Sequence, residues 1–482
     1  MAEIGEGALG ILNHERKSRN ATLLLLIFLI AIGSTIGVLS MESKLLLILP
    51  LTLVFIIGAI SPEISLYFIF ALILFGFDYV PGLIMQGLVL GAGIILLVFS
   101  LILRAGARKR LVRTATPLDM FMVFWILVVA ISAGAGILRQ NQMRYIVGDL
   151  LQFLLLPVFF FLTSIIFRTK EQINRLFICF IGFAFISGLI SLVGYLWSNP
   201  ITVAIEVGGV RDRLLTNVVA FTPFLLVLII AQLFFLKYSI PRGKLLFSGL
   251  LFLTLLFLII LFFSFTRGYW LGFSVALIFI LIMTKASFRY RVLKIMFILF
   301  LSFLGCLFLG QFFFKGNVFD LFSIVLERAL AFRDPTSYVY FRYYEMLTAL
   351  RASIKNPLWG IALGGEYFSP SEIVGDKWAW THYTHNNYVQ ILLRTGFLGM
   401  GSFLAIWIGF FYYGLRIYNR LNDPKLKAWT LGFLATFISA SVTSLTSPLL
   451  THYAIAPWLG IIMGLVFIID KLESKPRLSP TK

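Results

Sequence analysis

The sequence predicts an all-α polytopic membrane protein, and the composition and apolar runs of the 482-residue chain support this prediction. Hydrophobic residues make up 60% of the chain, charged residues make up only 13%, and the mean hydropathy is +0.96. A soluble domain carries roughly a quarter charged residues. The apolar residues also come in runs whose length is close to the roughly 17–25 residues that cross a bilayer as a helix.

The apolar runs predict about 12–14 transmembrane helices, because two of the runs are short for a complete crossing. Aromatic residues are abundant, with 50 phenylalanines and 18 tyrosines, and they suit lipid-facing and interfacial positions. The expected helices cover 21–40, 45–60, 64–78, 82–103, 118–138, 147–167, 176–197, 216–236, 245–264, 268–284, 294–314, 397–415, 428–447 and 453–470.

Basic residues gather in short loops between these runs, and cytoplasmic loops are enriched in Lys and Arg. If successive helices alternate in direction, the five basic loops and both chain ends fall on one side. Both termini are therefore expected in the cytoplasm. A net charge of +19 would suit a nucleic-acid partner. Its concentration in these short loops indicates membrane orientation instead, so no nucleic-acid partner is expected. The five loops lie at 104–113, 168–175, 237–244, 285–294 and 416–427.

The opposite face is then external, and it receives one long polar segment. This segment is expected to be partly helical, with apolar positions at helical spacing over 318–332 and 337–355. Asn356-Pro357 ends the second helix, because the residue before proline disfavours helical dihedral angles. The expected division is a cytoplasmic N-terminal tail over 1–20, transmembrane helices over 21–314, an external loop with the candidate catalytic motif over 315–396, C-terminal transmembrane helices over 397–470 and a cytoplasmic tail over 471–482.

Titratable and cationic side chains collect on the predicted external face, where the charge bias of cytoplasmic loops does not explain them. An ionisable group at membrane depth indicates a functional site by default. Three of the four histidines and three arginines lie there: His382, His385, His452, Arg211, Arg213 and Arg267.

His385, which precedes Asn386, has the chemistry of a general base, because an unperturbed imidazole titrates at about 6.5. The alternative is an interfacial histidine that only holds a neighbouring loop. A three-histidine metal site with His382 and His452 is a third interpretation, but no further ligand is spaced to support it. The two cysteines, Cys179 and Cys306, lie inside apolar runs, so a cysteine zinc site is excluded.

Arg267 lies between two apolar runs with almost no loop around it, so it needs an anion, a carboxylate or lipid headgroups as its partner. A guanidinium suits phosphate oxygens, and the alternative is that it reaches the membrane interface. Arg211 and Arg213 flank Asp212 and are either paired with nearby acids or part of a phosphate site. Arg342 and the residues after it are expected to cover the membrane helices.

Several of these residues together resemble the O-antigen ligase and polymerase superfamily of bacterial membrane glycosyltransferases. His385-Asn386 is followed, after nine residues, by Gly396-Phe397-Leu398-Gly399, which looks like the signature of that family. Arg342, Asn356, Pro357, Gly360 and Gly364 fall where the preceding family segment has them, and SFTRGYW resembles the element that carries the family's arginine, here Arg267. The motif resemblance covers about 260–400.

The resemblance implies a GT-C-like membrane fold and an inverting glycosyltransferase that needs no metal and no cofactor. The donor would be a polyprenyl-diphosphate glycan, commonly undecaprenyl-linked, and the reaction would occur at the outer, periplasmic face of the bacterial cytoplasmic membrane. His385 would deprotonate an acceptor hydroxyl, and Arg267 with Arg211 or Arg213 would bind the diphosphate. Asn386, Arg342, Gly396 and Gly399 would support the site.

The expected reaction is that of an O-antigen ligase, which joins a finished glycan to lipid A core. A surface-polysaccharide polymerase, which acts on a growing chain, and a protein O-glycosyltransferase carry the same motifs. A lipid-linked oligosaccharide flippase or other transporter is the alternative outside the family. A transporter predicts repeat symmetry and charged or broken helices near the bilayer midplane, and the sequence shows neither.

Overall fold

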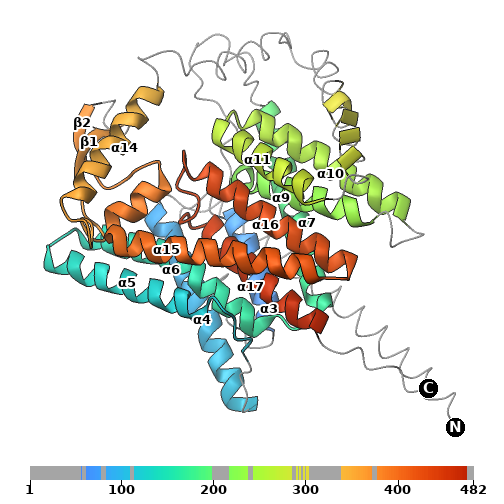
Figure 1. The fold of residues 1–482 in the computed structure, drawn as a ribbon, viewed down its shortest axis with the longest axis horizontal. Helices are drawn as coiled ribbons and strands as arrows, with labels where there is room; N and C mark the ends of the chain where they lie inside the picture. Colours follow the sequence, from blue (N-terminus) through green and yellow to red (C-terminus); the bar gives the residue numbers. More distant parts are fainter. Residues whose placement is uncertain are drawn as a thin grey trace. The chain divides into compact units, whose positions relative to one another are not determined.

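The computed structural model describes residues 61–76, 83–108, 113–197, 217–236, 243–284, 338–371 and 377–474, together with single positions between 56 and 305. The described chain is mostly helical, as the sequence predicts (Figure 1). Six of its helices are long and apolar enough to cross a membrane, and several shorter apolar helices accompany them. The protein is therefore a polytopic membrane protein.

The chain divides into two units, Met1–Leu111 and Val112–Lys482. In the first unit, α3 (Pro62–Ala71) begins at a proline, whose ring suits the first helical turn. It runs into a π-helical turn, η2 (Leu72–Gly76), and α4 (Leu83–Arg108) follows. The predicted helices at 21–40 and 45–60 lie outside the described residues.

The second unit holds the helices that matter for the candidate site. Its described helices are α5 (Asp119–Leu138), α6 (Met143–Ile166), α7 (Lys170–Trp197), α9 (Asn217–Leu236), α10 (Gly243–Phe263), α11 (Arg267–Met283), α14 (Tyr338–Ile354), α15 (Asn387–Arg420), α16 (Pro424–Thr443) and α17 (Ile455–Ser474). Most of these bounds fall within a few residues of the predicted ones. The predicted helix at 318–332 lies outside the described residues.

Small residues bring two of these helices close together beside the site. α16 packs against α9 and α11. A Cβ atom at Gly268 would overlap the Thr446 hydroxyl, and one at Gly272 would overlap the Thr443 hydroxyl. Thr443 Oγ1 donates to the Gly268 carbonyl at 3.0 Å. Two glycines four residues apart therefore let the first turns of α11 lie directly on the end of α16.

A small antiparallel sheet, which the sequence did not predict, lies between α14 and α15. β1 (Tyr367–Ser371) pairs with β2 (Lys377–Thr381), and Tyr367 lies opposite Thr381. Thr348 of α14 donates to the Ser369 hydroxyl at 3.0 Å, which holds the hairpin against that helix. Successive strand residues face opposite sides: Tyr367 is buried, whereas Phe368 is half exposed.

α15 begins at Asn387, ten residues before the predicted start at 397. The Asn386 side chain caps it by accepting from the Val389 N–H at 3.1 Å. Hydropathy misses these first turns because they contain Gln390 and Arg394, which are polar but buried. Tertiary partners make that burial possible.

A break at Gly396 divides α15. Its φ of 65° is left-handed, and a Cβ atom there would overlap the Leu358 carbonyl. The backbone that follows α14 enters the break: Phe397 N donates to the Pro357 carbonyl at 2.7 Å, and Ile361 N donates to the Leu393 carbonyl at 2.8 Å. The glycine thus permits both the bend and the close approach of the 357–361 segment.

A buried ion pair fixes the same region. The Arg394 guanidinium is fully buried, and its Nε lies 3.0 Å from Asp149 Oδ2 of α6. Asp149 also accepts from the Gly364 N–H at 2.8 Å, and Arg394 donates to the carbonyls of Gly365 and His382. One charged pair therefore connects α6, the turn after α14, the segment before α15 and α15 itself.

We expect Gly396→Ala to destabilise the protein, because the left-handed conformation of a non-glycine residue costs about 1–3 kcal/mol and the added methyl group meets the Leu358 carbonyl. Thermal unfolding in detergent measures the loss. Gly401→Ala is the matched control, since its Cβ would meet nothing within 4 Å in the helical part of α15. Equal melting temperatures for the two variants would contradict the prediction.

We expect Asp149→Asn to lower the free energy of unfolding by about 3–5 kcal/mol, because it leaves the buried Arg394 charge without its anion. The double variant Asp149→Asn/Arg394→Met removes that charge as well. Its destabilisation should be smaller than the sum of the two single effects, which a double-mutant cycle on unfolding measures. Simple additivity would show that the pair is not coupled.

Candidate functional site

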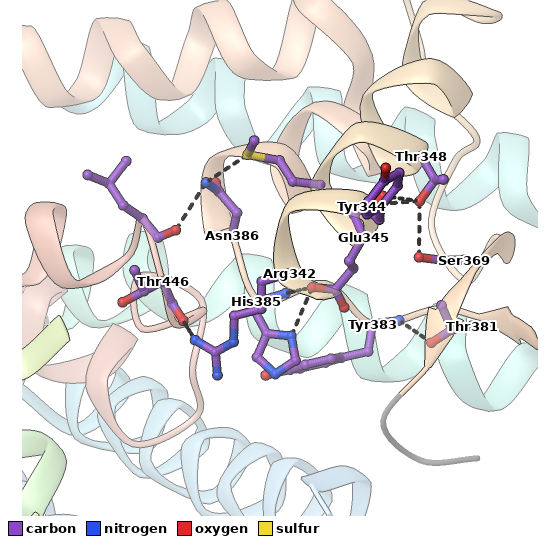
Figure 2. A network of polar contacts seen from close by, with 12 residues as sticks. Arg342, Tyr344, Glu345, Thr348, Ser369, Thr381, Tyr383, His385, Asn386 and Thr446 are labelled. Atoms are coloured by element: carbon purple, nitrogen blue, oxygen red, sulfur yellow. Dashed lines mark hydrogen bonds and ion pairs between the residues drawn. The ribbon is translucent and has the colours of Figure 1, made fainter. Parts of the chain in front are cut away.

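The centre of the candidate site is a carboxylate–imidazole pair between α14 and the segment that precedes α15 (Figure 2). His385 Nδ1 lies 2.9 Å from Glu345 Oε2, and the His385 backbone N–H donates to the same oxygen at 3.2 Å. The Glu345 side chain is 6% exposed, and that of His385 is 16% exposed. The Glu345 carboxylate is thus nearly shielded from solvent, while the His385 imidazole is still partly exposed to solvent.

This contact indicates which ring nitrogen of a neutral His385 is free to accept a proton. A carboxylate accepts hydrogen bonds, so the nitrogen that faces Glu345 is the protonated one in a neutral imidazole. Nε2 then carries the lone pair. General-base histidines use the same arrangement. One ring nitrogen contacts a carboxylate, and the other exchanges the reacting proton.

Aromatic side chains hold the imidazole in place. The Tyr383 ring meets the His385 ring edge-on, with 4.9 Å between centroids. The Tyr367 hydroxyl donates to the Tyr383 carbonyl at 2.9 Å, and Tyr383 N donates to the Thr381 hydroxyl at 3.3 Å. Burial, and next the charge of Glu345, raise the pKa of the Tyr367 hydroxyl, which therefore stays a donor. The β hairpin thus supports the loop that carries His385.

Arg342 lies one helical turn before Glu345, on the same side of α14. Its Nη1 donates to the Thr446 carbonyl at 2.9 Å (Figure 2). Thr446 is also the residue against which Gly268 packs. The end of α16 therefore connects the α14 face to the first turn of α11.

Arg267 is the first residue of α11. Gly268, the next residue, packs against Thr446, and Arg342 donates to the Thr446 carbonyl, so both arginines lie beside the same turn. Burial, and next the positive charge of Arg342, lower the pKa of Arg267. The N-terminus of a helix carries a partial positive charge of its own. Two arginines and a helix N-terminus therefore make this part of the site strongly electropositive, which favours an anion.

Asn386 and the residues after it tie the start of α15 to the end of α16. Asn386 Nδ2 donates to the Leu445 carbonyl at 3.1 Å, and Asn387 N donates to the Ser444 carbonyl at 3.0 Å. Gly396 accommodates the break described above, and Gly399 accepts the Thr395 side chain directly against its backbone.

The other two histidines occupy different settings. The His382 ring stacks on Tyr145, with 3.9 Å between centroids. Burial, then the charges of Arg394 and Arg144, lower its pKa to about 4. Burial also lowers the pKa of His452 to about 4, and its Nδ1 accepts from the Ala454 N–H at 3.2 Å. Among the described residues, no three His, Cys, Asp or Glu side chains are grouped as metal ligands, so the three-histidine site finds no support.

The predicted residues of the site divide into two groups. Arg267, Arg342, His385 and Asn386 are brought to one place, whereas Arg211 and Arg213 lie outside the described residues. Sequence reasoning missed Glu345 as the partner of His385, although an acid one turn after Arg342 on a mostly apolar helix was a visible signal.

Comparison with protein-family models gives one match. Residues 252–404 match the model described as O-antigen ligase, whereas no curated protein matches the chain. The matched segment begins in α10 and ends in α15, so it includes Arg267, Arg342, Glu345 and His385. Residues 252–404 are therefore similar to the domain of the O-antigen ligase family.

Proposed function

We propose that this protein transfers a glycan from a polyprenyl-diphosphate donor to an acceptor hydroxyl at the outer face of the bacterial cytoplasmic membrane. The observation that carries the proposal is the juxtaposition of an imidazole base with neighbouring guanidinium groups. His385 is held by Glu345 of α14. Arg342 on that helix donates to the carbonyl of Thr446, the residue against which Gly268, next to Arg267, packs. The proposed reaction needs a base for the acceptor hydroxyl and an anion site for the diphosphate.

The proposed base is His385. Its Nε2 accepts the proton of the acceptor hydroxyl, whose oxygen then attacks the anomeric carbon of the donor sugar. The new C–O bond forms as the bond from that carbon to the diphosphate oxygen breaks, and the bonding electrons leave with the diphosphate. Attack from the face opposite the leaving group inverts the configuration at the anomeric carbon. The proton stays on His385 until it is released to solvent.

Arg267 and Arg342 are the proposed partners of the leaving group. Negative charge develops on the diphosphate oxygens as the glycosidic bond breaks, and positioned donors stabilise such charge most strongly where water is excluded. A guanidinium offers a planar pair of N–H groups that matches phosphate oxygens. The same anion also offsets the repulsion between the two arginines. Arg211 or Arg213 remains a further predicted contact.

For the acceptor we propose lipid A core, the ligase reaction, over a growing polysaccharide chain. The family match supports the common step of glycan transfer, and the acceptor distinguishes the two reactions. A deletion strain tests the choice: complete loss of attached polymer indicates the ligase, and retention of single attached repeats indicates the polymerase. Release of the diphosphate lipid by purified protein, with donor and each acceptor in turn, tests the transfer directly.

We expect His385→Ala to reduce transfer at least about 100-fold, the lower end of what a general base contributes, because no group then takes the hydroxyl proton. Product release by purified protein measures the loss of transfer. The amount of protein and its binding of the donor should stay unchanged. Tyr343→Ala is the control, since Tyr343 is 53% exposed on the same helix as Glu345. A fully active His385→Ala protein would refute the role of the base.

We expect Arg267→Lys to lower kcat at least about 100-fold, as removal of one stabilising donor does. Lysine keeps the charge but loses the forked contact to phosphate oxygens. Steady-state kinetics with the lipid donor measures the effect, and Arg351→Lys at an exposed position of α14 is the matched control. If the Arg267→Lys variant keeps the wild-type kcat, the forked contact has no part in catalysis.

A further inference from the structure

We infer that Glu345 is the positioning residue for His385: its carboxylate keeps the proton on Nδ1, so Nε2 receives the acceptor proton, and its charge stabilises the imidazolium that results. This inference rests on the proposed function, because it assigns a task to a residue beside the proposed base. It goes further by naming the group that makes the base competent.

The first support is the double contact. One oxygen, Oε2 of Glu345, accepts from the His385 backbone N–H at 3.2 Å and faces Nδ1 of the same residue at 2.9 Å. The backbone contact places the Cα of His385, and the ring contact sets the rotation of the imidazole. A side chain that only anchored the loop would need the first contact alone.

The second support is burial. Glu345 is 4% exposed as a residue, and a charged group is seldom buried unless it is paired. A hydrogen bond between charged groups is stronger in a medium of low dielectric constant than in water. The imidazole, at 16% side-chain exposure, is the more accessible partner. The pair therefore has its carboxylate inside and its reacting ring toward the substrate side.

The third support is the set of groups around the pair. Tyr383 closes against the imidazole edge-on and restricts its rotation. Asn386, the next residue, is held as the cap of α15. Arg342, one turn before Glu345 on α14, donates to the Thr446 carbonyl and brings positive charge to this helix face. Glu345 brings the opposite charge, at its contact with His385 Nδ1.

Two substitutions separate the two tasks of Glu345. Glu345→Gln keeps the size and an acceptor oxygen but removes the charge, and Glu345→Leu removes both. We expect kcat to fall about 100-fold or more for Glu345→Gln and further for Glu345→Leu, within the range that general-base catalysis contributes. Donor binding by the purified protein should stay within about threefold of wild type, a difference well under 1.4 kcal/mol.

A direct measurement of the tautomer completes the test. The chain has only four histidines, so ¹⁵N-histidine labelling gives few ring signals, and the spectrum of His385→Gln identifies those of His385. At neutral pH we expect Nδ1 to carry the proton in the wild type. Glu345→Leu should show a mixture of both tautomers, whereas Tyr343→Phe, a change at an exposed position on α14, should not.

Three outcomes would overturn the inference: kcat within threefold of wild type for both Glu345 variants, an Nε2-protonated His385 in the wild type, or variants that lose donor binding and thermal stability as much as turnover. Each leaves the proposed function standing if His385→Ala is inactive. An active His385→Ala protein would instead reject the proposed function, so the two failures are distinguishable.

Discussion

An ionised side chain inside an apolar interior must be paired, and the region around the site is built on that constraint. Arg394 is fully buried in α15 and is held by Asp149 of α6 and by two backbone carbonyls. One of these carbonyls belongs to His382, three residues before His385. The other belongs to Gly365, in the turn that precedes β1. The guanidinium therefore couples the membrane helices to the segment that presents the imidazole.

The second structural device is a break in a helix that neighbouring backbone fills. A helix interrupted inside the protein leaves donors and acceptors unsatisfied, and a membrane protein must satisfy them internally. At Gly396 the 357–361 segment supplies these partners. Because this segment directly follows α14, the break also sets where α14 lies along α15. The distance between Glu345 and His385 follows from that placement.

Two successive turns of α14 contact different parts of the candidate site. Its turn with Arg342 faces the end of α16 and the first residue of α11, and its turn with Glu345 faces His385. One helix therefore carries both the arginine of the proposed anion site and the carboxylate that contacts the proposed base, so the spacing of these two groups does not depend on loop conformation. Preorganised groups of this kind need little rearrangement as charge develops during a reaction.

Apolar run length and the placement of ionisable residues were enough to predict the fold class, most helix positions, and Arg267 and His385 as candidate site residues. The supporting role of Asn386 was predicted from the family resemblance alone. The start of α15 at Asn387, the pairing of β1 with β2, and the burial of Glu345 and Arg394 beside their partners emerged from the folded chain alone. A charge is stable in an apolar interior only when a partner packs against it. Such partners cannot be identified from the sequence, because residues such as Asp149 and Arg394 lie far apart along the chain.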